Sequence, residues 1–182
     1  MKKRLFALLL VTLLATTIVV TTVSAQGLVL VYPWGGPYTA ETTDHIAIRW
    51  AWIATAPGLA KTYVNSVYNE FTLLDSGGNV VAHISDSEAD ALWTGVLSVP
   101  DELFGYDCPS GLLYGYMWYY ELGQLDADTY TLVSTVGNTK IVNDGFHTCT
   151  YLDGTPVTSP PSLFPAGIET AFVTIHVVEP SP

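Results

Sequence analysis

Positive charge is scarce in this sequence. Its 182 residues include 6 Lys and Arg against 17 Asp and Glu, a formal net charge of −11. Half of the cations lie at positions 2–4, and only three follow residue 25: Arg49, Lys61 and Lys140. Residues 26–182 therefore carry 3 cations against 17 acids, a net charge of −14. Nucleic acids and anionic membrane surfaces are bound through clusters of Lys and Arg, so we expect neither as a partner.

Motifs of common active sites are also missing. The sequence contains no G-x-S-x-G, no H-E-x-x-H and no glycine-rich phosphate loop. Its four histidines show no tight spacing with a cysteine, which argues against a zinc-type metal site. A glycosidase needs two carboxylates at a set separation, and a sequence does not give that distance. We therefore expect a protein that is not an enzyme, and a secreted hydrolase ranks third among the functions considered.

The N-terminus has the pattern of a secretory signal. Three cations at positions 2–4 precede an apolar run over residues 5–20, and small residues at Val23 and Ala25 suit cleavage before Gln26. Residues 5–23 are also just long enough to span a bilayer, so an uncleaved anchor is the competing interpretation. Five threonines dilute the run, and we expect cleavage after residue 25. The sequence thus predicts a secreted or cell-surface protein with no membrane segment after cleavage.

Only two cysteines are present, Cys108 and Cys149, and both lie in the exported part. Two cysteines in an oxidising compartment predict one disulfide. Its loop of about 42 residues would stabilise the fold by about 4 kcal/mol in the chain-entropy model. The alternative is a pair of unbonded, buried thiols.

Short β-branched and aromatic runs separated by turn residues indicate an all-β protein. Residues 26–182 show no repeat or linker and are expected to form one domain. We expect an antiparallel β-sandwich, with a jelly roll as a further possibility, because about ten short strands are predicted. The predicted strands are 28–32, 45–54, 67–75, 79–84, 94–99, 112–122, 129–136, 139–142, 146–152 and 168–178. Loops are predicted at 33–37 and 155–165, a short helix at 85–93, and turns at 75–79, 137–138 and 143–145.

The segment from Leu125 to Leu132, Leu-Asp-Ala-Asp-Thr-Tyr-Thr-Leu, resembles the entry to the penultimate strand of immunoglobulin-like and fibronectin type III-like domains. In those domains a tyrosine at the position of Tyr130 packs inward while its hydroxyl bonds the backbone upstream. The match covers about 8 residues. It departs from the pattern at Asp128, which replaces a small residue, and at Leu132, where antibody domains carry a cysteine. The resemblance implies an immunoglobulin-like sandwich but no particular function.

Aromatic residues are the most distinctive candidates for binding. Alternate positions of a strand share a face, so one row is predicted to comprise Tyr114, Tyr116, Trp118 and Tyr120. Facing solvent, this row would form a platform for sugar rings or a protein surface; facing inward, it would fill the core. We favour the core for Trp118. Trp50 and Trp52 are interpreted as core residues, whereas Trp34, in a Gly/Pro-rich loop, is the better candidate contact.

Acidic residues form clusters at Asp86, Glu88 and Asp90 and at Asp126 and Asp128. Closely spaced carboxylates favour Ca²⁺, although the spacing does not match an EF-hand loop. We favour a solvated acidic surface or a helix N-terminus as the explanation of these clusters. We expect no cofactor, with Ca²⁺ as the one possible ion, and we expect mutual repulsion to raise the pKa values of several carboxyl groups.

These observations rank the possible functions. First comes a non-enzymatic adhesion or structural interaction module at or outside the cell surface, with an extracellular protein as its partner. Second comes a carbohydrate-binding module that uses the aromatic row or Trp34 to bind a polysaccharide. The direction in which the row faces discriminates between the two. The oligomeric state does not follow from the sequence.

Overall fold

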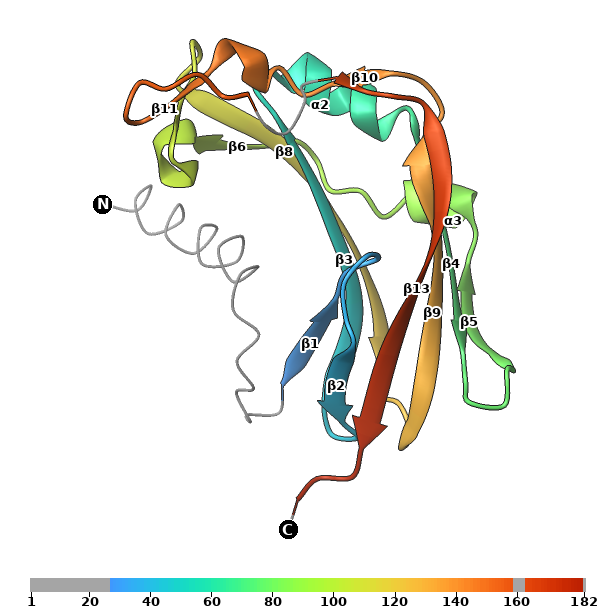
Figure 1. The fold of residues 1–182 in the computed structure, drawn as a ribbon. Helices are drawn as coiled ribbons and strands as arrows, with labels where there is room; N and C mark the ends of the chain where they lie inside the picture. Colours follow the sequence, from blue (N-terminus) through green and yellow to red (C-terminus); the bar gives the residue numbers. More distant parts are fainter. Residues whose placement is uncertain (1–26, 159–162, 182) are drawn as a thin grey trace.

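Two facing β-sheets make up the body of the protein, as Figure 1 shows. The computed structural model describes residues 27–158 and 163–181. The predicted signal sequence, residues 1–25, lies outside the described residues. No helix within the described part of the chain is both long and apolar enough to cross a membrane.

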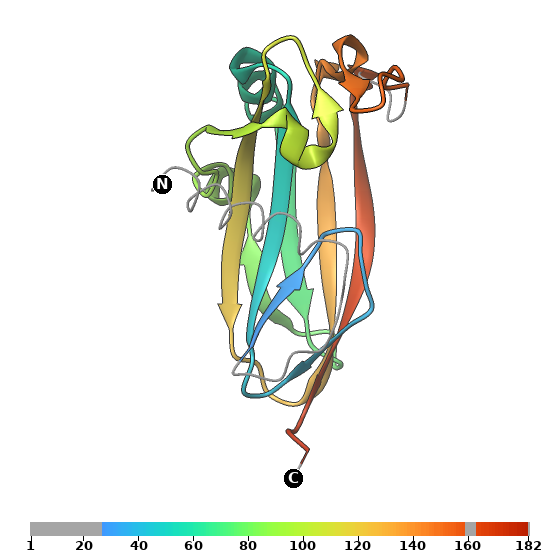
Figure 2. The ribbon, with the colours of Figure 1, turned by 90° about the vertical axis from the view of Figure 1, so that its left-hand side faces the viewer.

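The first sheet has four strands, in the order β1 (Leu28–Val31), β3 (His45–Ala54), β8 (Leu112–Gly123) and β6 (Leu97–Pro100). Its centre is the antiparallel pair of β3 and β8, in which Trp50 lies opposite Trp118. The edge strand β1 runs parallel to β3 and covers only residues 45–48 of it. Figure 2 shows β1 beside the lower part of β3 alone.

The second sheet has five strands, in the order β2 (Tyr38–Glu41), β13 (Gly167–Val178), β9 (Asp128–Asn138), β4 (Val67–Leu74) and β5 (Val80–Ile84). All of its pairs are antiparallel except β2 with β13. The loop between β1 and β2 therefore carries the chain from one sheet to the other. Within it, Gly36 lies so close to β13 that a Cβ would stand 3.1 Å from Val173 Cγ1.

Short elements close one end of the sandwich. They are α2 (Pro57–Val64), η1 (Asp101–Phe104), β7 (Tyr106–Asp107), β10 (Val142–Asn143), η2 (Phe146–Thr148), β11 (Thr150–Tyr151) and β12 (Leu163–Phe164). The helix α3 (Asp86–Asp90) follows β5 and contacts β4. β7 pairs with β11 and β10 with β12, each over two residues.

The prediction of an all-β sandwich is confirmed. Both sheets are mixed, because β1 pairs in parallel with β3 and β2 pairs in parallel with β13. The predicted long strands at 45–54, 67–75, 112–122, 129–136 and 168–178 are confirmed to within a few residues. The turns at 75–79 and 143–145 are also present, and the predicted helix forms only over Asp86–Asp90.

Several local predictions were wrong. The turn predicted at 137–138 does not form, because both residues lie within β9 and pair with β4 and β13. Helix α2 was not predicted, although Pro57 suits the first turn of a helix. The strand predicted at 139–142 pairs only over Val142–Asn143. The strand predicted at 146–152 is a 3-10 turn followed by two paired residues, because Gly145 adopts a left-handed φ of 82° just before it. Within the predicted loop at 155–165, β12 forms, and residues 159–162 lie outside the described part.

Alternating side chains fill the space between the sheets. Along β4, the inward positions Val67, Asn69, Phe71 and Leu73 are all buried. Trp118 of the facing sheet is 1% exposed, and its ring centroid lies 4.8 Å from that of Phe71. Its indole Nε1 donates a hydrogen bond to the carbonyl oxygen of Ala89, at 2.7 Å. Trp118 therefore joins both sheets and α3 in one core.

Replacing Trp118 with alanine tests this role. We expect Trp118→Ala to lower the free energy of unfolding by about 3–5 kcal/mol, because it empties a large buried site and removes a buried hydrogen bond. The neighbouring Tyr119 faces outward and is 38% exposed, so Tyr119→Ala should change stability by no more than about 0.5 kcal/mol. Denaturant unfolding measures both variants. Equal effects would contradict the inward orientation of Trp118.

Candidate functional site

The aromatic row of β8 does not form an exposed platform. Strand alternation places Tyr114, Tyr116 and Tyr120 on the same face as Trp118, which lies in the core between the sheets. The three tyrosines are half-buried, and the ring of Tyr120 stacks on that of Trp118 with centroids 6.4 Å apart. Trp118 and Tyr120 therefore help to pack the sandwich.

Trp34 lies at the seam where the chain passes from one sheet to the other. It is 55% exposed, and its ring packs edge-on against Trp50 with a centroid distance of 4.3 Å. Trp50 itself is 6% exposed and lies on β3 just beyond the end of β1. Trp34 thus combines an anchored face with an accessible one, as a contact residue requires.

The upper part of β3 has an unpaired edge. β1 covers β3 up to Ile48, and no described strand pairs with the same edge from residue 50 to residue 54. Within the described part of the chain, the next backbone bond on this side is from the N–H of Thr55 to the carbonyl oxygen of Asp144, at 2.8 Å. A gap in the hydrogen-bond ladder therefore separates β1 from Asp144.

The backbone groups that face this gap follow from the pairing on the other side. Met117 of β8 lies opposite Ala51, and its N–H and C=O bond Thr94 rather than β3. Ala51 and Met117 are therefore a non-hydrogen-bonded pair, so the N–H and C=O of Ala51 point away from β8. The same alternation applies to Ile53. Both residues direct their backbone groups into the gap.

An aromatic pocket of about 220 Å³ adjoins the unpaired edge. Its described lining consists of Ala51, Trp52, Ile53, Tyr106, Asp144, Phe146 and Phe164. On one side, Trp52 packs edge-on against Phe164, with ring centroids 4.9 Å apart, while its other contact is a stacked pair with Tyr63. On the other side, Tyr106 packs against Phe146 at 4.8 Å. Apolar rings and one carboxylate thus surround the space beside β3.

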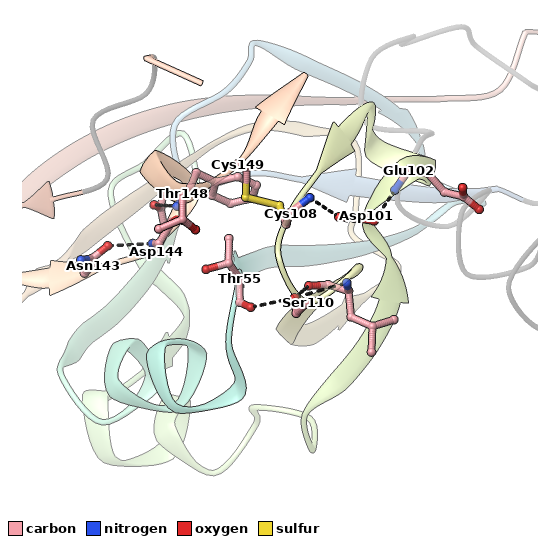
Figure 3. Close-up of a disulfide and its surroundings, with 12 residues drawn as sticks. Thr55, Asp101, Glu102, Cys108, Ser110, Asn143, Asp144, Thr148 and Cys149 are labelled. Atoms are coloured by element: carbon pink, nitrogen blue, oxygen red, sulfur yellow. Dashed lines mark hydrogen bonds between the residues drawn. A yellow bond between two sulfur atoms is a disulfide. The ribbon is translucent and has the colours of Figure 1, made fainter. Parts of the chain in front are cut away.

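A disulfide holds the Tyr106 and Phe146 wall together. Cys108 follows β7 and Cys149 follows η2, and the two are bonded with their Cα atoms 4.3 Å apart, as predicted (Figure 3). The buried Asp101 accepts a hydrogen bond from the N–H of Cys108 at 2.5 Å. The second, smaller hydrophobic cluster of the protein surrounds this bond, and it includes Leu113 of β8. The wall is therefore fixed to the first sheet.

The turn at 143–145 positions Asp144 at the end of the gap. Gly145 has a φ of 82°, and a Cβ there would collide with Thr55 Oγ1. The N–H of Gly145 bonds the Asn143 side chain at 2.7 Å, and the N–H of Phe146 bonds the Asp144 carboxylate at 3.0 Å. Glycine at this position thus lets the turn approach β3 closely enough for the Thr55–Asp144 bond.

The acidic clusters cap and brace the backbone. The Glu88 carboxylate accepts hydrogen bonds from the N–H and the hydroxyl of Ser85, at 2.9 and 2.6 Å, in a capping box at α3. Asp86 accepts a bond from the N–H of Asn69, and Asp128 accepts one from the N–H of Ser76. No three His, Cys, Asp or Glu side chains in the described residues are grouped so as to hold a metal ion. Asp86 and Glu88 thus lie in the first turn of α3, as the helix N-terminus interpretation expects, whereas Asp128 is the first residue of β9.

The prediction that repulsion raises several carboxyl pKa values was wrong for four exposed groups. Hydrogen bonds from Asn79, Ser85, Ser76 and Thr155 lower the pKa of Asp75, Glu88, Asp128 and Asp153, respectively. The pKa of the Asp90 carboxyl is raised, and there burial is a larger cause than the charge of Asp86. Local donors thus outweigh the net charge, because repulsion between exposed charges is screened.

A lowered pKa makes a stabilising contribution that is present above the unfolded pKa and is lost as the pH falls through the folded one. For the four groups with lowered pKa, we expect the melting temperature to stay level from pH 7 to about 5 and to fall below about pH 4. The raised pKa of Asp90 makes a contribution of opposite sign to the change of stability with pH. Thermal unfolding followed from pH 7 to 3 measures this. A collapse of the melting temperature above pH 5 would contradict the assignment.

Sequence reasoning missed most of the pocket. Trp52 was interpreted as a core residue, and Tyr106, Phe146 and Phe164 were not singled out. The turn at 143–145 and the cysteines were the available signals, because together they bring distant segments to the end of β3. Of the predicted contacts, only Trp34 lies beside the unpaired edge.

Comparison with family models, with curated proteins and with solved structures found no significant match for the chain. Its function therefore has to be argued from the geometry of β3 and the adjoining pocket.

Proposed function

We propose that this chain is an exported, non-enzymatic interaction module that binds another extracellular protein, in adhesion or in a structural assembly. The observation that carries the proposal is the unpaired upper edge of β3 beside the aromatic pocket. Backbone groups at a sheet edge and a nearby apolar pocket are what polypeptide partners use. Export is supported by the signal-like pattern of residues 1–25 and by the disulfide, which persists in oxidising compartments.

Carbohydrate binding remains the second candidate. The inward orientation of Trp118 removes the platform on which a sugar would stack, and this favours the protein partner. The exposure of Trp34 supports carbohydrate binding, because more than half of the surface of this side chain is accessible. A hydrolase has less support, since Asp144 is the one carboxylate in the described lining of the pocket and glycoside hydrolysis uses two.

An immunoglobulin-like affiliation is also part of the proposal. Two observations support it: the strand orders β1-β3-β8-β6 and β13-β9-β4-β5, which are those of the two sheets of such domains, and a hydrogen bond at the predicted corner. There the Tyr130 hydroxyl donates to the carbonyl oxygen of Asp126, four residues upstream, at 3.0 Å. The parallel pairing of β1 with β3 departs from that pattern. The affiliation suggests a scaffold and no particular ligand.

Site-specific photo-crosslinking in the producing cells tests the proposed function. A photoreactive amino acid replaces Phe164 at the pocket, with the exposed turn residue Asn79 as the matched control position. We expect a protein adduct from position 164 and none from position 79. A glycan array, run with and without Ca²⁺, is the companion measurement. Saturable glycan binding that Trp34→Ala abolishes without loss of stability, together with no adduct, would make carbohydrate binding the function.

A further inference from the structure

We propose that the partner binds by strand addition: an extended segment of another polypeptide pairs with residues 50–54 of β3 and continues the line that β1 begins. This inference rests on the proposed function and names its mode and the chemistry of the partner. The occupant is a peptide strand that carries an apolar anchor and no acidic side chains.

The backbone of β3 supplies the first argument. Ala51 and Ile53 direct their N–H and C=O groups into the gap, and no described residue bonds them there. Ile48 and Thr55 mark its two ends. At about 3.3 Å per residue they lie about 23 Å apart, which accommodates a strand of about four to six residues. Such a strand would satisfy backbone groups that no described residue bonds.

The side chains beside the gap supply the second argument. The pocket opens along three consecutive residues of the same edge, Ala51, Trp52 and Ile53. In an added strand, side chains alternate between two faces, so one of them can enter the pocket while the backbone pairs with β3. The space of about 220 Å³ suits a single large apolar or aromatic anchor. Pairing thus gives affinity, and the pocket selects the anchor.

Charge supplies the third argument. Residues 26–182 carry a net charge of −14, and Asp144 lies at the upper end of the gap. An acidic segment would be repelled, whereas lysine or arginine flanking the anchor would be attracted to this surface. The expected partner segment is therefore uncharged or basic, rich in β-branched or aromatic residues, and free of proline.

Ala51→Pro separates strand addition from other modes of binding. Proline removes the N–H of Ala51, one of the two that Ala51 and Ile53 direct into the gap, and it is tolerated where that N–H is not part of a ladder. Ala51→Val is the matched control, because it keeps the N–H and adds similar bulk. The probe is a phage-displayed library of random 12-residue peptides, followed by synthetic copies of those that it enriches. Circular dichroism and thermal unfolding verify that both variants fold.

We expect the full-length protein and Ala51→Val to enrich the same peptides, with an aromatic or aliphatic anchor near Lys or Arg. Ala51→Pro should weaken their binding at least about tenfold. Methylating alternate backbone nitrogens of an enriched peptide should weaken its binding by a similar factor. This measurement uses the unmodified protein, so it tests strand addition even where Ala51→Pro fails to fold.

Three outcomes would overturn the proposal. They are enrichment of no peptide, binding that neither Ala51→Pro nor N-methylation affects, and a homodimer that Ala51→Pro dissociates, which would make a second copy the occupant. If the photo-crosslinked partner binds the Ala51→Pro variant as tightly as the unmodified protein, the result would support the interaction function and contradict strand addition.

Discussion

β3 is longer than the strand that covers its outer edge, and this mismatch governs the candidate site. β1 ends opposite Ile48, whereas β3 continues to Ala54 and remains bonded to β8 throughout. Every backbone polar group needs a partner or water, so an incomplete ladder leaves a defined set of groups available. The chain does not extend β1 because the loop at 33–37 turns at this level to begin β2 on the other sheet. Because the chain changes sheets early, no described strand pairs with the rest of this edge.

Aromatic packing keeps this end of the sandwich rigid. Trp52 stacks on Tyr63 of α2, with parallel rings 3.9 Å apart, and Tyr63 is 2% exposed. Trp50 and Trp93 pack against the same tyrosine at about 6 Å. The disulfide fixes the opposite wall of the pocket to the first sheet. A preformed edge and a preformed pocket reduce the ordering that a partner would have to impose on binding.

The sequence predicted what depends on local patterns. The core position favoured for Trp118 is the one it occupies, and the turn predicted at 143–145 is present with Gly145 at a positive φ. It could not predict the pocket, because Trp52, Tyr106 and Phe164 are distant in sequence and meet only after the sheets form. The unpaired edge was equally invisible, since it depends on where β1 stops relative to β3. The prediction of raised carboxyl pKa values was wrong for a similar reason. Hydrogen-bond donors come from distant parts of the sequence; Ser76, for example, is 52 residues from Asp128.

Amide hydrogen exchange along β3 tests the central claim most directly. The N–H groups of Trp50 and Trp52 face β8 and belong to hydrogen-bonded pairs, whereas those of Ala51 and Ile53 face the gap. The account predicts alternation in the free protein, with slow exchange at Trp50 and Trp52 and fast exchange at Ala51 and Ile53. Uniformly slow exchange from residue 49 to residue 54 would mean that the edge is already paired, and it would contradict the account.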